Sequence, residues 1–234
     1  MLLALANYVC ADTTKVLVID TGINKHKYIP GTNGLCKTGH KDFTFSGLDD
    51  DLGHGTNVSG IIHKYAKHYD YCQIVVKYYN KGITKELSLF NMIRSLEYAK
   101  EIKPDIINIS SSGSGYYSRE HDLIKELLDM GIVIIAAAGN DGMMLNSMYC
   151  SGNGNCSKYN QYPAGYDKRV YVVGNKYPNG DVYPSSNYGE LVDVWRVGVD
   201  VEGDYGGVLM TGTSQATAIF TGEYTAKLSR RLRK

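Results

Sequence analysis

Residues 15–20 read Lys-Val-Leu-Val-Ile-Asp and are followed by a Thr-Gly pair. A continuous run of Val, Leu and Ile that ends at a turn is typical of a parallel strand buried on both faces. Later apolar runs of the same character lie at residues 73–77, 105–110 and 132–138. Helical patterns separate them at residues 86–103 and 119–130. This alternation predicts an α/β fold of three layers, in which helices cover both faces of a mostly parallel, twisted sheet.

The remainder of the chain extends the same pattern. Residues 24–53 are rich in Gly, Lys and Asp and are predicted to be a surface loop with one short strand near residues 43–45. We expect helices to begin at His54 and Ser214. Further strands are expected at residues 169–173 and 191–194, with a hairpin formed by residues 199–202 and 205–210. The length of 234 residues suits one domain, which we place at residues 12–234.

Composition limits the choice of partners. The chain carries 25 basic and 24 acidic residues, which leaves no electrostatic footprint for nucleic acid or a membrane surface. We therefore expect neither as a partner, and we expect a monomer. Residues 1–11 are apolar but too short to span a bilayer. They are either the remnant of a secretory signal cleaved after Ala11 or an N-terminal arm packed on the domain.

Cysteine content bears on the compartment. Of the 5 cysteines, Cys10 lies in the N-terminal segment, and the remaining four allow three connectivities. Cys150 and Cys156 bracket a turn-rich Ser-Gly-Asn-Gly-Asn segment, and we predict a bridge between them. We also predict a bridge between Cys36 and Cys72. Such bridges indicate secretion or another oxidising compartment, and no Cys or His spacing supports a metal site.

Three residues of catalytic type stand at the ends of predicted core elements. Asp20 ends a strand, His54 begins a helix, and Ser214 lies at a sharp turn from an apolar run into the last helix. A serine at a helix start is ordinarily an N-cap. A hydroxyl there can also attack a carbonyl, because free backbone N–H groups and the helix dipole favour a developing oxyanion. The order acid, base, nucleophile along the chain favours the second interpretation.

Five segments resemble motifs of the subtilisin-like serine proteases, or subtilases, in the family's order. They are residues 18–23 around the acid, 53–56 around the histidine, 108–110 on a substrate strand, 136–140 before an asparagine, and 212–216 around the serine. The resemblance covers nearly the whole chain and implies the subtilisin-like fold. It implies that His54 is the general base, that Asp20 orients it, and that Ser214 is the nucleophile. Asn140 and the backbone N–H of Ser214 would then stabilise the oxyanion.

The resemblance also implies a cleft that binds an extended polypeptide as an added strand between two backbone segments. One segment is formed by Ser110, Ser111, Ser112 and Gly113, and the other by Lys85, Glu86 and Leu87. Ala138 and Gly139 are further substrate-binding residues, and Gln161 is expected at the floor of the primary specificity pocket. A polar floor predicts that large apolar side chains are not strongly preferred there. Other implied partners are a pro-segment or a protein inhibitor, and no cofactor is implied.

The chain departs from the family pattern at several points. Only a brief polar stretch separates Ile62 from residue 73, so we expect the family's calcium site in this region to be absent. Asn57 stands where a second histidine is common, and Gln215 stands where many relatives carry methionine. The acidic run at residues 49–51 is either a solvated loop or a site for a cation or a basic substrate residue.

Together these features predict a serine endopeptidase that acts through an acyl-enzyme. Its activity should rise with pH as the histidine loses a proton, near the imidazole reference of about 6.5. Two alternatives stay open. The same site would serve a peptide ligase or macrocyclase if an amine replaced water, and a catalytically silent fold would serve as a peptide-binding module.

Overall fold

The computed structural model describes residues 13–24, 26, 31, 33–150, 156–206 and 208–232. Within these ranges, a sheet of 7 strands has the order β2-β3-β1-β4-β5-β8-β9, and all neighbouring strands are parallel. The strands are β1 (Thr14–Asp20), β2 (Lys41–Asp42), β3 (Tyr71–Lys77), β4 (Ile106–Ile109), β5 (Val133–Ala137), β8 (Tyr171–Asn175) and β9 (Val194–Arg196). The helices are α1 (His54–Ala66), α2 (Lys85–Ile102), α3 (Ser118–Asp129) and α4 (Thr213–Leu232).

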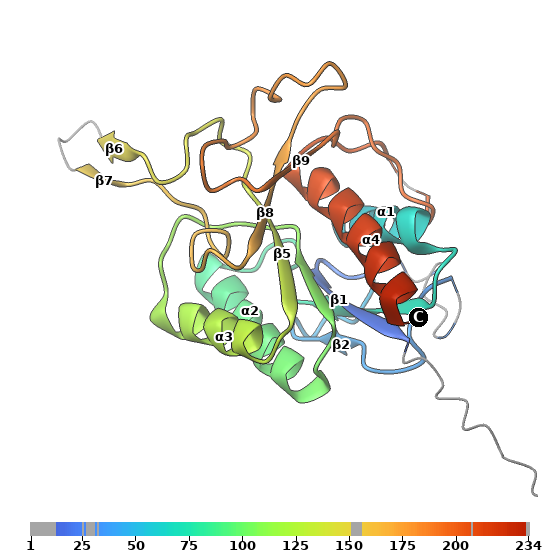
Figure 1. Ribbon diagram of the computed structural model, residues 1–234. Coiled ribbons are helices and arrows are strands. Elements are labelled where there is room, and N and C mark those ends of the chain that lie inside the picture. Colours follow the sequence, from blue (N-terminus) through green and yellow to red (C-terminus); the bar gives the residue numbers. More distant parts are fainter. Residues whose placement is uncertain are drawn as a thin grey trace, which may run out of the picture.

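Helices cover both faces of the sheet, as the sequence predicted. Helices α2 and α3 lie on one face, and α1 and α4 lie on the other (Figure 1). Alternate residues of β1 supply both layers, because successive side chains of a strand point to opposite faces. Leu17 and Ile19 belong to the core beneath α2 and α3, and Val16 and Val18 belong to the core beneath α1 and α4. The fold is therefore a three-layer α/β fold.

The strand order creates a switch point next to β1. From β1 the chain runs outward on one side to β3, and it then returns to β4 and continues outward through β5. In open parallel sheets, ligands bind outside the carboxyl ends of the strands at such a point. Asp20 ends β1, and Ser110 directly follows β4. The topology thus brings these two residues to the edge where a site is expected.

Several peripheral elements differ from the sequence-based expectation. The short strand expected at residues 43–45 is Lys41–Asp42 instead, and the strand expected at residues 191–194 is shifted to Val194–Arg196. The expected hairpin at residues 199–210 is reduced to an isolated bridge between Val201 and Met210. Between them, the backbone N–H of Asp204 donates to the carbonyl of Gly60 on α1, and Tyr205 is buried. Packing against α1 therefore replaces strand pairing in this segment.

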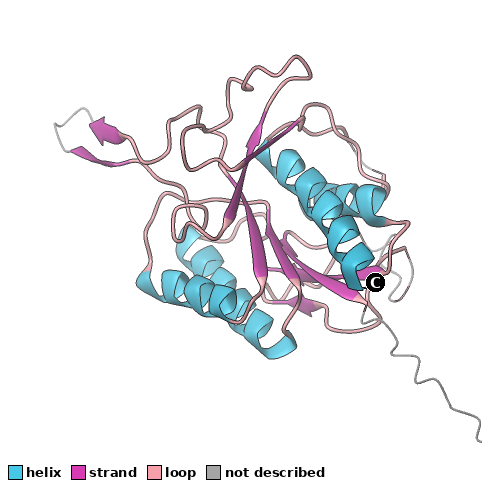
Figure 2. Cartoon of the chain, viewed as in Figure 1, coloured by secondary structure: helices cyan, strands magenta, loops and turns pink. Residues whose placement is uncertain are grey.

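A small hairpin was missed by the sequence patterns. Strands β6 (Met148–Cys150) and β7 (Cys156–Lys158) pair antiparallel, with Cys150 opposite Cys156. The hairpin projects from the body of the molecule (Figure 2). The side chains of the two cysteines lie outside the described residues, so their bridge remains a prediction. The predicted bridge between Cys36 and Cys72 is present and joins the loop before β2 to strand β3.

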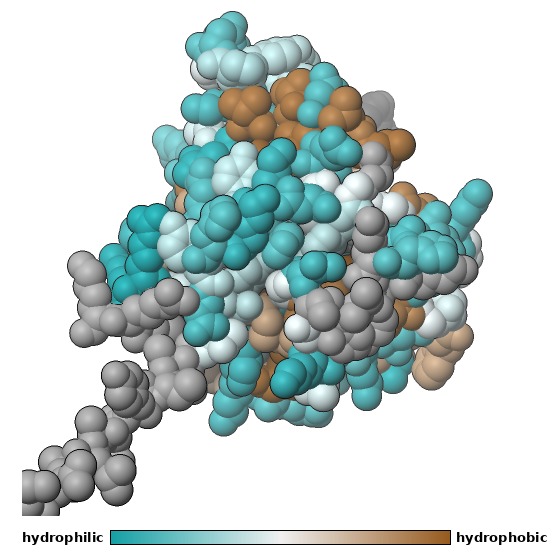
Figure 3. Space-filling view, turned by 90° about the vertical axis from the view of Figure 1, so that its right-hand side faces the viewer, coloured by the Kyte–Doolittle hydropathy of each residue, from teal (hydrophilic) through white to brown (hydrophobic). Residues whose placement is uncertain are grey.

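The connection after α1 is short, since α1 ends at Ala66 and β3 begins at Tyr71. In the described ranges, no group of three His, Cys, Asp or Glu side chains could hold a metal ion. None of the described helices is long and apolar enough to cross a membrane. The face seen in Figure 3 is mostly hydrophilic, with apolar residues gathered near one end.

Candidate active site

Asp20 and His54 form a hydrogen-bonded pair at the carboxyl edge of the sheet. The His54 Nδ1 and Asp20 Oδ1 atoms are 2.7 Å apart, and only 2% of the Asp20 side chain is exposed. The backbone N–H of Thr21 donates to the same carboxylate oxygen at 2.8 Å. The second oxygen, Oδ2, is buried and has no partner among the described residues. The carboxylate is thus positioned to orient the imidazole and to stabilise its protonated form.

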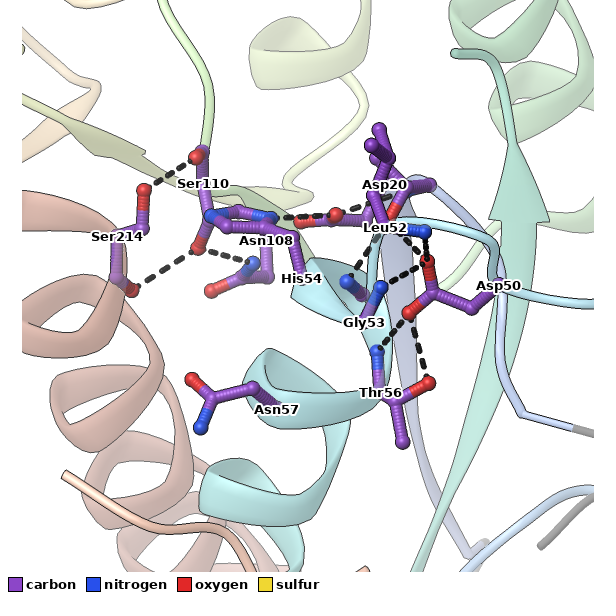
Figure 4. A network of polar contacts seen from close by, with 12 residues as sticks. Asp20, Asp50, Leu52, Gly53, His54, Thr56, Asn57, Asn108, Ser110 and Ser214 are labelled. Atoms are coloured by element: carbon purple, nitrogen blue, oxygen red, sulfur yellow. Dashed lines mark hydrogen bonds and ion pairs between the residues drawn. The ribbon is translucent and has the colours of Figure 1, made fainter. Parts of the chain in front are cut away.

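A second buried carboxylate, Asp50, fixes the start of α1, where His54 lies (Figure 4). Its Oδ2 accepts hydrogen bonds from the Thr56 backbone N–H and hydroxyl at 2.8 and 2.7 Å. Its Oδ1 accepts from the Thr21 hydroxyl at 2.8 Å and from the Gly53 N–H at 2.9 Å. A carboxylate at a helix N-terminus satisfies free N–H groups and complements the dipole. Of the acidic run, Asp50 therefore acts within the protein and is neither solvated nor directed at a substrate.

The approach of α1 to β1 depends on glycine. A β-carbon at Gly55 would clash with the carbonyl oxygen of Gly22. The Gly55 N–H donates to the Thr21 hydroxyl at 2.8 Å, which in turn binds Asp50. The first turn of α1 is thus held directly against the end of β1, and this brings His54 within reach of Asp20.

The environment of His54 shifts its pKa upward. Burial alone would lower the pKa, but the charge of Asp20, the hydrogen bond to Asp20 and the charge of Asp50 together outweigh burial. The neutral form that can accept a proton therefore predominates only above a pH higher than the ordinary histidine value.

Ser214 lies in the first turn of α4, on the opposite side of the His54 ring from Asp20 (Figure 4). Its hydroxyl donates to the backbone carbonyl of Ser110 at 2.7 Å, and the Ser110 hydroxyl donates to the Ser214 carbonyl at 3.1 Å. Asn108 donates to the Ser110 hydroxyl at 2.9 Å. This reciprocal pair fixes the start of α4 to the end of β4. In this state the Ser214 proton is directed at Ser110 and not at His54.

Asn140 faces the start of α4 with a defined amide orientation. Its Oδ1 accepts from the Thr213 backbone N–H at 2.9 Å and from the Thr213 hydroxyl at 3.1 Å. Because Oδ1 is occupied in this way, the Nδ2 group remains as a donor near the start of α4. Asn140 and Ser214 both line the same cleft. The arrangement is suited to donating a hydrogen bond to an oxyanion formed next to Ser214.

A cleft of about 1070 Å³ contains these groups. It is lined by predicted residues from both sides of the site, namely Asp20, His54, Lys85, Ser110, Ser111, Ser112, Gly113, Asn140, Gln161 and Ser214. The other predicted residues do not line it, namely Glu86, Leu87, Ala138 and Gly139. Glu86 and Leu87 are exposed on the first turn of α2, and Ala138 is fully buried behind the cleft.

Gln161 is buried and lines the cleft. Its Nε2 donates to the Asp141 carboxylate at 3.1 Å and to the Tyr159 hydroxyl at 2.9 Å. A β-carbon at Gly139 would lie 3.0 Å from Cγ of Gln161 and 3.2 Å from the Ser112 hydroxyl. The side chain of Gln161 therefore fills space between the strand segments that follow β4 and β5.

Asn57 and Gln215, the two residues that depart from the family pattern near the serine, bind each other. Gln215 is 2% exposed, and its Nε2 donates to Asn57 Oδ1 at 3.0 Å. Asn57 in turn donates to the carbonyl of Val201 at 3.0 Å. An amide pair thus fills the space between α1 and α4 behind Ser214, without a thioether beside the hydroxyl.

Sequence reasoning missed several residues that line the cleft. They are chiefly Tyr78 and Tyr79 after β3, Leu89 and Met92 on α2, Glu120 on α3, and Asp141. The position of Tyr78 directly after a core strand was an available signal, as was the position of Asp141 directly after Asn140. Glu120 had none, because an acidic residue in the first turn of an amphipathic helix is ordinary.

Comparisons with known proteins identify a family and several relatives. The model of a family described as the subtilase family matches residues 11–230. The minor extracellular protease Epr of Bacillus subtilis (strain 168) is 29% identical over 215 residues, which cover 87% of this chain and 30% of that protein. Subtilisin-like protease 2 of Arthroderma benhamiae is 29% identical over 212 residues, 86% of this chain and 46% of that protein. The chain thus spans less than half the length of these relatives.

Solved structures show the same fold. The crystal structure of a lanthipeptide protease has a TM-score of 0.74 at 19% identity and covers 94% of this chain and 74% of its own. A cold-adapted subtilisin-like serine proteinase has a TM-score of 0.73 at 22% identity and covers 94% of this chain and 77% of its own. At these identities the likeness concerns the fold alone.

Proposed function

The chain belongs to the subtilase family. On this premise we propose that it is a serine endopeptidase, in which Asp20, His54 and Ser214 catalyse the hydrolysis of peptide bonds. The observation that carries the proposal is the 2.7 Å bond between His54 and a buried carboxylate, in a cleft that also contains Ser214. A pure peptide-binding module has no need of an oriented base beside a hydroxyl.

Catalysis begins with a rotation of the Ser214 hydroxyl from the Ser110 carbonyl toward the free ring nitrogen of His54. His54 takes the proton as Ser214 Oγ attacks the peptide carbonyl, and Asp20 stabilises the imidazolium that forms. Nδ2 of Asn140 and the Ser214 backbone N–H donate to the oxyanion. His54 then protonates the leaving amine, and water, activated by the same base, hydrolyses the acyl-enzyme.

The substrate is an extended polypeptide held along the segment Ser110 to Gly113, with Lys85 on the facing side. The residue whose carbonyl is attacked enters the space beside Gln161. Because this side chain already occupies part of that space and is tied to Asp141 and Tyr159, small or polar residues are favoured there. Secretion is supported by the Cys36–Cys72 bridge and by the extracellular relative from B. subtilis.

The test is covalent labelling of the purified protein with a fluorophosphonate, beside a Ser214→Ala variant, followed by intact mass. We expect one adduct in the parent protein and none in the variant, and a loss of peptide hydrolysis of about a million-fold, as for the same change in subtilisin. Product mass then identifies the reaction, because hydrolysis adds water and ligation does not. Equal labelling of both proteins, or none in the folded parent, would refute the proposal.

A further inference from the structure

Glu120 is a buried carboxylate in the cleft that the proposed mechanism does not use. It lies in the first turn of α3, is 6% exposed, and lines the same cleft as Ser214. Its Oε2 accepts a hydrogen bond from the Tyr166 hydroxyl at 2.7 Å. Among the described residues, it forms no ion pair with a lysine or arginine. A buried carboxylate without a cationic partner is costly to ionise and is a candidate ligand for a cation.

A chain of contacts connects Glu120 to one end of the Ser110–Gly113 segment. Ser110 contacts Ser214 at one end, and Gly113 exchanges two backbone hydrogen bonds with Tyr162, of 3.0 and 2.8 Å, at the other. The Tyr162 ring packs on Tyr166, with centroids 4.4 Å apart, and Tyr166 binds Glu120. Three steps of an extended strand cover about 10 Å. These contacts connect Glu120 to the Gly113 end of the segment, whereas Ser214 contacts its Ser110 end.

The surroundings of Glu120 suit a side chain with an apolar stem and a charged end. Ile83, Leu89 and Met92 line the cleft on the α2 side. Three carboxylates line the cleft, from Asp20, Glu120 and Asp141, whereas Lys85 is its single lysine or arginine among the described residues. Burial raises the pKa of Glu120, and the hydrogen bond from Tyr166 only partly opposes this. A bound cation would favour the ionised form.

We propose that Glu120 binds the cationic end of an arginine or lysine of the substrate, at a position about three to five residues from the scissile bond. The stem of that side chain packs on Leu89 and Met92, and its charged group pairs with the free Glu120 oxygen. The inference rests on the proposed protease function and names its substrate class: polypeptides with a basic residue set back from the cleavage point.

The test compares peptides that carry arginine or its neutral analogue citrulline at each of five positions on either side of one scissile bond. At one position we expect kcat/KM to be about 30-fold higher for arginine, the lower range for a buried charge pair. In Glu120→Gln this ratio should fall to near one, with citrulline peptides cleaved as by the parent. Glutamine still accepts the Tyr166 hydrogen bond, so a purely structural role would leave the ratio unchanged. Glu126→Gln changes a partly exposed glutamate on the same helix, which pairs with Lys100 outside the cleft, and is the control.

Failure of this inference is distinguishable from failure of the protease proposal. If Ser214 is labelled and citrulline peptides are cleaved, but arginine gives no gain at any position, the role of Glu120 is refuted and the protease remains. Binding is measured separately in a Ser214→Ala background by fluorescence anisotropy, which requires no turnover. There, tighter binding of the arginine peptide that is lost on adding Glu120→Gln supports the inference, and equal binding of both peptides overturns it.

Discussion

The two walls of the cleft differ in how they hold their catalytic groups. On the β1 and α1 side, Asp20, Thr21 and Asp50 bind one another or the first turn of α1, so His54 is oriented before a substrate arrives. On the β4 and α4 side, the Ser214 hydroxyl is bound to Ser110 and must turn before it can react. Folding thus orients the base before substrate binds, whereas the serine hydroxyl reaches its reactive orientation only after it leaves Ser110. Four variants test this difference, in order of decreasing effect.

Asp20→Asn removes the carboxylate that orients His54. An amide cannot stabilise the imidazolium and favours the wrong tautomer of His54, so we expect kcat to fall about ten-thousandfold. Steady-state kinetics on a cleaved peptide measures the loss. Asp122→Asn, an exposed carboxylate on α3, should leave kcat unchanged. A loss of less than tenfold in Asp20→Asn would show that the pair with His54 is not catalytic.

Asn140→Ala removes the side-chain amide on the α4 side of the cleft. Removing the amide that Thr213 orients should lower kcat by about 100- to 1,000-fold with little change in KM, because the oxyanion exists only in the transition state. Asn179→Ala, in an exposed turn, serves as the control. A change confined to KM would assign Asn140 to substrate binding and not to the oxyanion.

Gln161→Gly probes the pocket next to Ser214. Removing the side chain opens the space against Gly139, so kcat/KM for phenylalanine before the scissile bond should rise about tenfold relative to alanine. Tyr159→Phe removes a hydrogen bond to Gln161 without adding space and should not alter this ratio. An unchanged preference in Gln161→Gly would place the pocket elsewhere in the cleft.

Asp50→Asn weakens the hydrogen bonds that hold the start of α1, and it leaves the three proposed catalytic residues unchanged. In the parent, activity should rise with pH through a midpoint above the ordinary histidine value of 6.5, because the pKa of His54 is raised and the neutral form is required. Loss of the Asp50 charge should move that midpoint to lower pH. We also expect the free energy of unfolding to fall by about 2 kcal/mol, since buried N–H and hydroxyl donors lose an acceptor.

The control is Asp51→Asn, which changes an exposed neighbour and should affect neither quantity. Urea unfolding measures the stability and a pH–rate profile measures the midpoint. A raised histidine pKa also predicts that the contribution of the Asp20–His54 pair to stability is complete below about pH 6.5 and is lost as pH rises through the raised value. A midpoint that is the same in the parent and in Asp50→Asn would contradict the assigned role of Asp50.

Local patterns sufficed for the centre of the fold and failed at its margins. The run that contains Leu17 and Ile19 is apolar on both faces, and only a strand between two helical layers buries it fully. The sequence at residues 199–210 alternates like a hairpin, but the Asp204 backbone N–H bonds to Gly60 on α1 and only Val201 and Met210 pair with each other. No local pattern records that competition. The hairpin of β6 and β7 was missed for the opposite reason, because its pairing strands are only 3 residues each.

From the sequence we predicted the order of the central strands and of the helices, the three-layer class and the candidate residues Asp20, His54 and Ser214, because periodicity and motif spacing are local properties of the chain. The surroundings of these residues depend on tertiary contacts. Asp50 is buried beneath α1, Gln161 is hydrogen-bonded to Asp141, and Glu120 lines the cleft. Each of these facts depends on contacts between residues far apart in sequence, whose energies are set by burial and hydrogen-bond geometry after the chain has folded.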